Sequence, residues 1–216
     1  MSDQSDLLRA SDPAREPASL NGTGLLPSQV IGEMIRNHEI LSSDPVDARQ
    51  IQPASLDLRL GGVAYRVRSS FLPGSKRSVR EGLRDVSMGE IELASGAILE
   101  KGCVYIVPLK ESLALTSRIT AIANPKSSIG RLDIFTRLIT DEAAEFDRVG
   151  AGYSGPLYAE ISPRAFTVVV REGSSLNQIR FRRGNPNHSD ASLRRLHQQW
   201  SLVDRCLLYT SPSPRD

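Results

Sequence analysis

Short stretches with strand-like alternation, separated by turn residues, follow one another through most of this chain. Between residues 52 and 60, three leucines alternate with Asp57 and Arg59, which is the two-residue period of a strand with one apolar face. Further strands are predicted at 63–67, 91–93, 97–100, 104–109, 112–115, 119–123, 132–140, 157–161 and 167–170. This density of short strands favours a jelly roll or barrel over a parallel sheet, so the predicted fold is mainly β.

Two short helices are predicted around the β region, one near its start and one after its end. Residues 28–38 place four apolar side chains on one face, and residues 191–200 have Leu193, Leu196 and Trp200 at helical spacing. Trp200 is therefore expected to be a packing residue. The segment 71–90 is basic and contains Gly and Pro, and we expect a solvated loop there.

Composition excludes several classes of protein. The chain has 216 residues, 39% of them hydrophobic, and a net charge of +2, which is too small to indicate nucleic-acid binding. No apolar run approaches the ~20 residues of a membrane span. The two cysteines form no disulfide framework and favour a reducing cytoplasm. Zinc-dependent nucleobase deaminases carry H-x-E and P-C-x-x-C elements; both are missing, and the three histidines are scattered. A zinc site is therefore not expected.

The stretch 124–133, Asn-Pro-Lys-Ser-Ser-Ile-Gly-Arg-Leu-Asp, gathers hydroxyls and cations around a turn. Phosphate binding needs hydroxyl and backbone N–H donors beside positive charge. Lys126, Ser127, Ser128 and Arg131 supply this combination, and Gly130 lets the backbone approach closely. On the pattern alone, however, such a turn is most often simply solvated.

The stretch 152–160, Gly-Tyr-Ser-Gly-Pro-Leu-Tyr-Ala-Glu, places one carboxylate in an apolar run. A reaction that activates water needs a carboxylate in a dry pocket, and Glu160 is a candidate for that role. A lone glutamate in a strand more often faces solvent.

Four blocks in one order, over about residues 50 to 183, resemble the dCTP deaminase family of the dUTPase-like superfamily. They are the two stretches above, residues 52–61 (Gln-Pro-Ala-Ser-Leu-Asp-Leu-Arg-Leu-Gly) and residues 173–179 (Gly-Ser-Ser-Leu-Asn-Gln-Ile). The resemblance implies a distorted jelly roll or β-clip. Their surroundings resemble a subgroup in which two such domains are fused in one longer chain, and this chain resembles the N-terminal half.

The resemblance implies zinc-independent hydrolysis of dCTP to dUTP and ammonia. Glu160 matches the carboxylate that moves the protons, while Ser127 and Arg131 match residues lining the catalytic site. Lys126, Ser128, Tyr153 and Gln178 match the substrate-binding side, with Tyr153 near the sugar. Asp57 matches a residue that helps to hold the Mg²⁺ ion accompanying the triphosphate. Family sites lie between subunits, which implies a trimer or a pseudo-trimer of domains.

One position departs from the relatives. In dUTPases and many dCTP deaminases an Asp lies five residues before the glycine matched to Gly155, where this chain has Gly150. Asp147 lies three residues earlier. Since that Asp activates water for pyrophosphate release in dUTPases, its absence weighs against a dUTPase or a bifunctional enzyme. A half that only binds nucleotide or completes the trimer is a third alternative.

The predicted organisation has four parts. Residues 1–24 are expected to be a disordered leader, and 25–184 the dCTP deaminase-like domain. Residues 185–205 are expected to be a linker and short helix toward a missing second domain. Residues 206–216 resemble a translated sequencing adapter, with a natural disordered tail as the alternative. On this interpretation the chain is a fragment that folds yet has lost part of each site.

Overall fold

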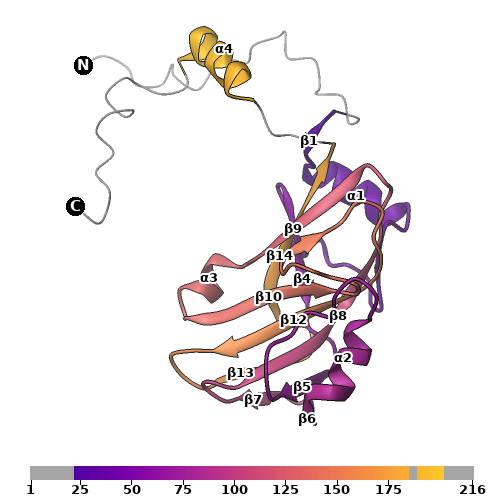
Figure 1. The fold of residues 1–216 in the computed structure, drawn as a ribbon, viewed down its shortest axis with the longest axis vertical. Helices are drawn as coiled ribbons and strands as arrows, with labels where there is room; N and C mark the ends of the chain where they lie inside the picture. The colour runs from indigo at the N-terminus through magenta and orange to yellow at the C-terminus, as the bar shows by residue number, and fades with distance from the viewer. Residues whose placement is uncertain (1–21, 185–188, 202–216) are drawn as a thin grey trace, which may run out of the picture. The chain divides into compact units, whose positions relative to one another are not determined.

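The computed structural model describes residues 22–184 and 189–201, and it divides after Gly184 into two compact units. The first unit contains two six-stranded sheets and a small two-stranded one (Figure 1). The predicted mainly β fold, with a short helix before the β core and another after it, is confirmed.

The strands, in chain order, are β1 (Gly24–Leu25), β2 (Ile40–Ser42), β3 (Ile51–Gln52), β4 (Ser55–Arg59), β5 (Val63–Val67), β6 (Ser87–Glu92), β7 (Ala97–Leu99), β8 (Val104–Ala114), β9 (Ile119–Pro125), β10 (Ile134–Thr140), β11 (Arg148–Val149), β12 (Ser154–Pro163), β13 (Val168–Val170) and β14 (Ser175–Arg183). The helices are α1 (Ser28–Arg36), the 3₁₀ turn η1 (Ala48–Gln50), α2 (Val79–Val86), α3 (Ser127–Gly130) and α4 (Asp190–Trp200).

All strand pairs are antiparallel, and neighbours in a sheet are mostly distant in sequence. The first sheet has the order β11-β9-β14-β4-β3, with β1 also paired to β14, and the second has the order β10-β12-β8-β5-β6, with β2 paired to β8. β13 pairs with β7. Such non-local pairing is typical of jelly-roll folds.

The main core lies between the two sheets. Leucines of β4 pack there against leucines of β8, β10 and β12 in one apolar cluster, and a second cluster joins β5, β8 and β12 to β7 and β13. On β12, Leu157, Ala159 and Ile161 belong to these clusters. Because side chains alternate along a strand, Tyr158 and Glu160 point to the opposite, outer face of the second sheet.

The outer face of the second sheet is covered by a third apolar cluster, which the sequence analysis did not foresee. The expected loop 71–90 contains α2, whose Val79 and Leu83 pack over Ile106, Ile139 and Tyr158. The prediction of a plain loop was therefore wrong. It missed a capping box, the Ser-x-x-Glu pattern that marks a helix start.

The capping box lies at Ser78 and Glu81. The Ser78 hydroxyl accepts from the Glu81 N–H at 3.2 Å, and the Glu81 carboxylate accepts from the Ser78 N–H at 2.7 Å. Asp141, just after β10, accepts from the Val79 N–H at 2.7 Å. This contact ties the start of α2 to the end of β10, so the cover over the outer face is anchored at that point.

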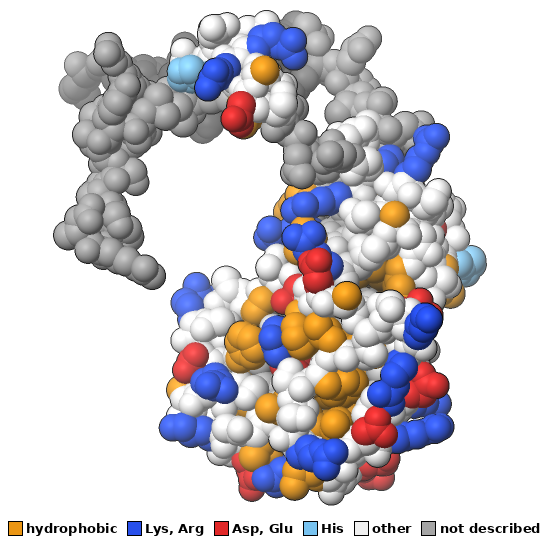
Figure 2. All heavy atoms as spheres, in the orientation of Figure 1, with side chains coloured by type: hydrophobic (Ala, Val, Ile, Leu, Met, Phe, Trp, Pro, Cys, Tyr) orange, Lys and Arg blue, Asp and Glu red, His pale blue; other side chains and the backbone are white. Residues whose placement is uncertain are grey.

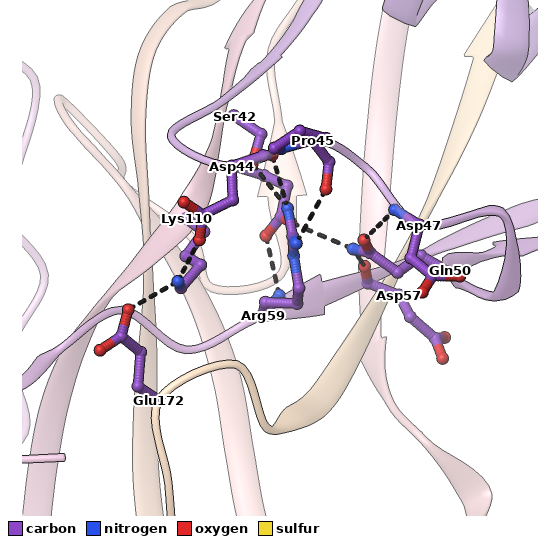
Figure 3. A network of polar contacts seen from close by, with 10 residues as sticks. Ser42, Asp44, Pro45, Asp47, Gln50, Asp57, Arg59, Lys110 and Glu172 are labelled. Carbon is purple, nitrogen blue, oxygen red and sulfur yellow. Dashed lines mark hydrogen bonds and ion pairs between the residues drawn. The ribbon is translucent and has the colours of Figure 1, made fainter. Parts of the chain in front are cut away.

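A buried polar network joins the two sheets (Figure 3). Glu111 of β8 is fully buried and accepts from the Arg59 N–H (2.7 Å), the Arg59 Nε (2.8 Å) and the Gln50 Nε2 (3.1 Å). The rest of the Arg59 guanidinium donates to the Ser42 hydroxyl and to the carbonyls of Asp44 and Pro45. Because Glu111 and Arg59 each make several hydrogen bonds in addition to their ion pair, the network stabilises the fold around β4.

The ends of the chain bring further outcomes. The predicted leader reached residue 24, but Gly24 already pairs with Arg183 in the first sheet; residues 1–21 and the suspected adapter tail 206–216 lie outside the described residues. α4 confirms the predicted second helix, yet it buries none of its side chains and Trp200 is 74% exposed. The packing role of Trp200 stays a prediction. In the part of the chain that the structure describes, no helix has the length and apolar content needed to span a membrane.

Candidate active site

Glu160 is the most deeply buried of the predicted site residues. It lies on the outer face of β12, and its side chain is 2% exposed. One oxygen, Oε1, accepts from the Arg137 Nε at 3.1 Å and from Nη2 at 2.5 Å. The other oxygen, Oε2, is buried without a hydrogen-bond partner among the described residues. A buried carboxylate with one oxygen held and one free can accept a proton from a molecule placed beside it.

Arg137 is a site residue that the sequence analysis missed. β10 pairs with β12 so that Arg137 lies directly opposite Glu160. Its Nη2 also donates to the Ser70 hydroxyl at 2.9 Å, and its Cζ lies 3.5 Å from the ring centroid of Phe146 and 4.8 Å from that of Phe135. The sequence did contain one signal, a cation inside the apolar strand 132–140. Its partner, however, is set by the register between β10 and β12, which the sequence does not give.

Asp147 lies close enough to Arg137 and Glu160 to interact electrostatically with both, and one of its carboxylate oxygens is bound to the backbone of β10. Its Oδ1 accepts from the Leu138 N–H at 2.7 Å. Burial raises the pKa of Asp147, the Leu138 hydrogen bond and the charge of Arg137 lower it, and the charge of Glu160 raises it further. Asp147 is therefore within electrostatic range of Glu160, and its backbone bond fixes it to β10.

A second group of predicted residues meets on the first sheet. Lys126 and Asp57 form an ion pair, and Gln178 lies opposite Asp57 in the β4–β14 register. The Ser55 hydroxyl donates to the Gln178 Oε1 at 3.1 Å. The structure thus brings Asp57, Lys126 and Gln178 together, as a site for phosphates requires.

A cleft of about 370 Å³ opens beside the Lys126–Asp57 pair. It is lined by Asp47, Arg49, Gln50, Asp57, Arg59, Lys126, Gly173 and Ser175. Three of these side chains are cationic and two are anionic, which suits an incoming anion better than a bare metal ion.

A magnesium ion fits this cleft only as a companion of phosphates. Mg²⁺ usually keeps several waters and takes one or two protein carboxylates together with substrate phosphates. Asp57 is the acceptor closest to Lys126, and it would be that carboxylate. In the part of the chain that the structure describes, no three His, Cys, Asp or Glu side chains group as a metal site.

Ser127, Ser128 and Arg131 belong to a different element from Glu160. Ser127 and Ser128 open the four-residue helix α3, Arg131 follows it, and all three are exposed. No hydrogen bond or ion pair within the described residues joins them to Glu160. Within a single chain, therefore, the predicted catalytic residue Glu160 is buried on β12, whereas Ser127 and Arg131 are exposed at α3.

Tyr153 folds back onto its own hairpin. Its hydroxyl donates to the Pro156 carbonyl at 2.6 Å and accepts from the Asp141 N–H at 3.2 Å, and burial raises its pKa. A Cβ atom on Gly155 would lie 2.7 Å from the Tyr153 hydroxyl, so glycine is required there for this ring position. The predicted contact of Tyr153 with the sugar stays a prediction.

Comparison with known proteins places these features in a family. The profile of the 2'-deoxycytidine 5'-triphosphate deaminase (DCD) N-terminal domain matches residues 22–185. A dCTP deaminase, dUMP-forming, from Persephonella marina is 32% identical over 113 residues, covering 51% of this chain and 60% of that relative. A protein of the same name from Coprothermobacter proteolyticus is 28% identical over 160 residues, covering 73% and 81%.

A solved structure agrees with the sequence relatives. The crystal structure of 2'-deoxycytidine 5'-triphosphate deaminase from Agrobacterium tumefaciens is 53% identical, with a TM-score of 0.78, and the match covers 85% of this chain and 55% of that chain. The chain thus spans little more than half of the Agrobacterium protein and 60% of the Persephonella one. With the profile covering most of its length, the chain belongs to the family of dCTP deaminase N-terminal domains.

Proposed function

We propose that this protein deaminates dCTP by hydrolysis, giving dUTP and ammonia. The observation that carries the proposal is Glu160: it is buried, held through one oxygen by Arg137, and left with a free second oxygen. The names of the relatives support the same substrate.

The chemistry requires a base that becomes an acid. Water adds to C4 of the cytosine ring, and the Glu160 Oε2 takes the proton that the water loses. The carboxyl group gives this proton to N3. It then takes the second proton from the C4 hydroxyl and passes it to the amine, so that the C4–N bond breaks, ammonia departs and a carbonyl forms at C4. Protein donors near the ring would stabilise the tetrahedral intermediate, a role that we assign to Ser127 and Arg131.

The exposure of Ser127 and Arg131 at α3 supports a site shared between domains. Ser127 and Arg131 are exposed, and next to them Leu132 and Phe135 are exposed hydrophobic residues. Figure 2 shows that hydrophobic side chains gather over the middle of the face that carries β10 and β12, with charged side chains among them. We propose that α3 of one domain completes the site of its neighbour in a trimer or a pseudo-trimer of domains.

The second group of residues would bind the triphosphate. Lys126 provides the cation. Gln178, which lies opposite Asp57 on β14, and Ser128 of α3 are the proposed hydrogen-bonding groups. Mg²⁺ would accompany the phosphates with Asp57 beside it. We also infer a reducing cytoplasmic location from the low cysteine content.

Formation of dUMP is the second candidate, favoured by the printed names of the Persephonella and Coprothermobacter relatives. It needs a carboxylate that activates water at the phosphates. Position 150, where many relatives have this aspartate, is a glycine. This fact favours dUTP as the product.

Product analysis tests the proposal. The 216-residue chain and the longest reading frame that contains it are incubated with dCTP and Mg²⁺, and the nucleotides are separated. Equal amounts of dUTP and ammonia are expected. Accumulation of dUMP with pyrophosphate would establish the second candidate, and no conversion by a folded oligomer of the longer frame would refute the enzyme and leave a nucleotide-binding or trimer-completing role.

A further inference from the structure

We propose that Arg137 is the positioning residue of the deamination site, fixing Glu160 through Oε1 so that Oε2 is the oxygen that moves the proton. The proposal rests on the function inferred above. It concerns a residue that was not among the sequence candidates and that reaches the reacting atoms through Glu160.

In the Arg137–Glu160 pair, the guanidinium binds only one of the two carboxylate oxygens. Two nitrogens of the guanidinium, Nε and Nη2, both donate to Oε1. A pair that bound both oxygens would also occupy Oε2, whereas here Oε2 is buried and has no hydrogen-bond partner among the described residues. The contact therefore orients the carboxylate without using the atom that the chemistry requires.

The guanidinium is itself held on the outer face. Phe146 and Phe135 provide aromatic rings within cation–π distance of its Cζ, and the Ser70 hydroxyl takes one more of its hydrogens. These contacts come from β10, from the loop after it and from the connection between β5 and α2. With three elements around it, Arg137 has little freedom to leave Glu160.

The charged groups around the pair predict a pH dependence. Arg137 faces Glu160 from β10, Asp147 lies in range from the loop before β11, and β8 places the apolar Ile106 opposite Glu160. Without Arg137 a buried carboxylate would remain with no cation, and its neutral form would be favoured. The base would then be protonated over a wider range of pH.

The first arm of the test is a pH profile of Arg137→Met, Arg137→Lys and the matched control Arg66→Met. Arg66 pairs with Glu100 at 3.0 Å in a half-exposed ion pair. At neutral pH, Arg137→Met is expected to lower kcat by about 10²-fold and to change the KM for dCTP by less than about 3-fold. The acid limb of its profile should move to higher pH, with partial recovery of kcat there; Arg137→Lys should be intermediate and Arg66→Met unchanged. An equal loss of kcat at every pH would overturn the positioning role.

The second arm does not depend on activity. Unfolding equilibria are measured for the wild type, Arg137→Met, Glu160→Gln and the double variant. Coupling of at least about 10-fold in the unfolding constant is expected, because the two side chains are in direct contact. Additive effects would overturn the proposal. If the four proteins show coupling but the wild type does not convert dCTP, the proposed function fails, while the contact by which Arg137 positions Glu160 is supported.

Discussion

Glu111 and Glu160 are both buried acids of the second sheet, and each is paired with an arginine from another strand. Glu111 has both oxygens occupied, by the backbone and guanidinium of Arg59 and by Gln50. Glu160 has one oxygen occupied by Arg137 and one without a partner. The first arrangement satisfies every acceptor, while the second leaves one unsatisfied in a dry environment.

The difference separates stabilisation from chemistry. A fully hydrogen-bonded buried ion pair fixes the strands that carry it. A buried carboxylate oxygen without a partner costs free energy of folding, and such a cost is typical of a site that keeps an acceptor for its substrate. The position in the fold agrees: Glu111 of β8 contacts Arg59 of the facing sheet, and Glu160 lies on the outer face of the second sheet.

The largest effect on activity is expected for Glu160→Gln. The amide keeps the size of the side chain but cannot take a proton, so kcat for deamination of dCTP should fall by about 10²- to 10⁴-fold. Ammonia release measures this, with Glu100→Gln, a half-exposed acid paired with Arg66, as the control. Unchanged turnover in a folded Glu160→Gln protein would place the chemistry at another residue.

The largest effect on stability is expected for Glu111→Gln. This change removes the charge that balances Arg59, whose side chain is 14% exposed, and should lower the free energy of unfolding by about 3–5 kcal/mol. Urea denaturation gives the value, and Glu172→Gln, which breaks the more exposed pair with Lys110, should cost less than about 1 kcal/mol. Similar losses in both variants would contradict the distinction between the two acids.

A smaller, kinetic effect is expected for Lys126→Met. Because Lys126 lies beside the cleft next to Asp57, loss of its charge should raise the KM for dCTP by about 10-fold and leave kcat less affected. The comparison is with Lys101→Met, which removes an exposed lysine from the turn before β8. A fall in kcat with unchanged KM would mean that Lys126 acts on the reacting ring and not on the phosphates.

The smallest effect is expected for Asp147→Asn, and it should depend on pH. The folded-state pKa of Asp147 lies above the ordinary value of 3.8, so its favourable contribution is present below that value and is lost as the pH rises through the folded-state value. Asparagine can still accept from the Leu138 N–H. The variant should therefore gain stability relative to the wild type between pH 4 and pH 7, by about 1 kcal/mol or less, measured as Tm across that range.

A difference in Tm that does not change with pH would show that the charge of Asp147 plays no part. A gain that appears only when Glu160 is also present would instead sharpen the comparison, because it would report the repulsion between these two acids.

Much of the local structure could be predicted from the sequence. Alternation of Leu56, Leu58 and Leu60 indicated a strand with one buried face, and these leucines are buried in the structure. The helical spacing in 28–38 likewise gave α1. In both cases the signal is the spacing at which apolar residues repeat along one segment. This spacing depends only on whether that segment is a strand or a helix.

The candidate site was only partly predictable. Lys126, Asp57 and Gln178 were singled out separately, and they meet because β4, β9 and β14 are neighbours. Helix α2 and the apolar cluster beneath it were not foreseen, because the segment was predicted as a loop. The sequence also left open whether Glu160 was buried.

The sequence by itself determined that a lone glutamate stands in an apolar strand, that hydroxyls and cations precede it at a turn, and that the chain is mainly β. Only the tertiary structure decided that Glu160 is buried and paired with Arg137. The reason is physical. Residue spacing fixes which side chains share a face of one strand, but the partner across a sheet depends on register between segments distant in sequence, here β10 and β12.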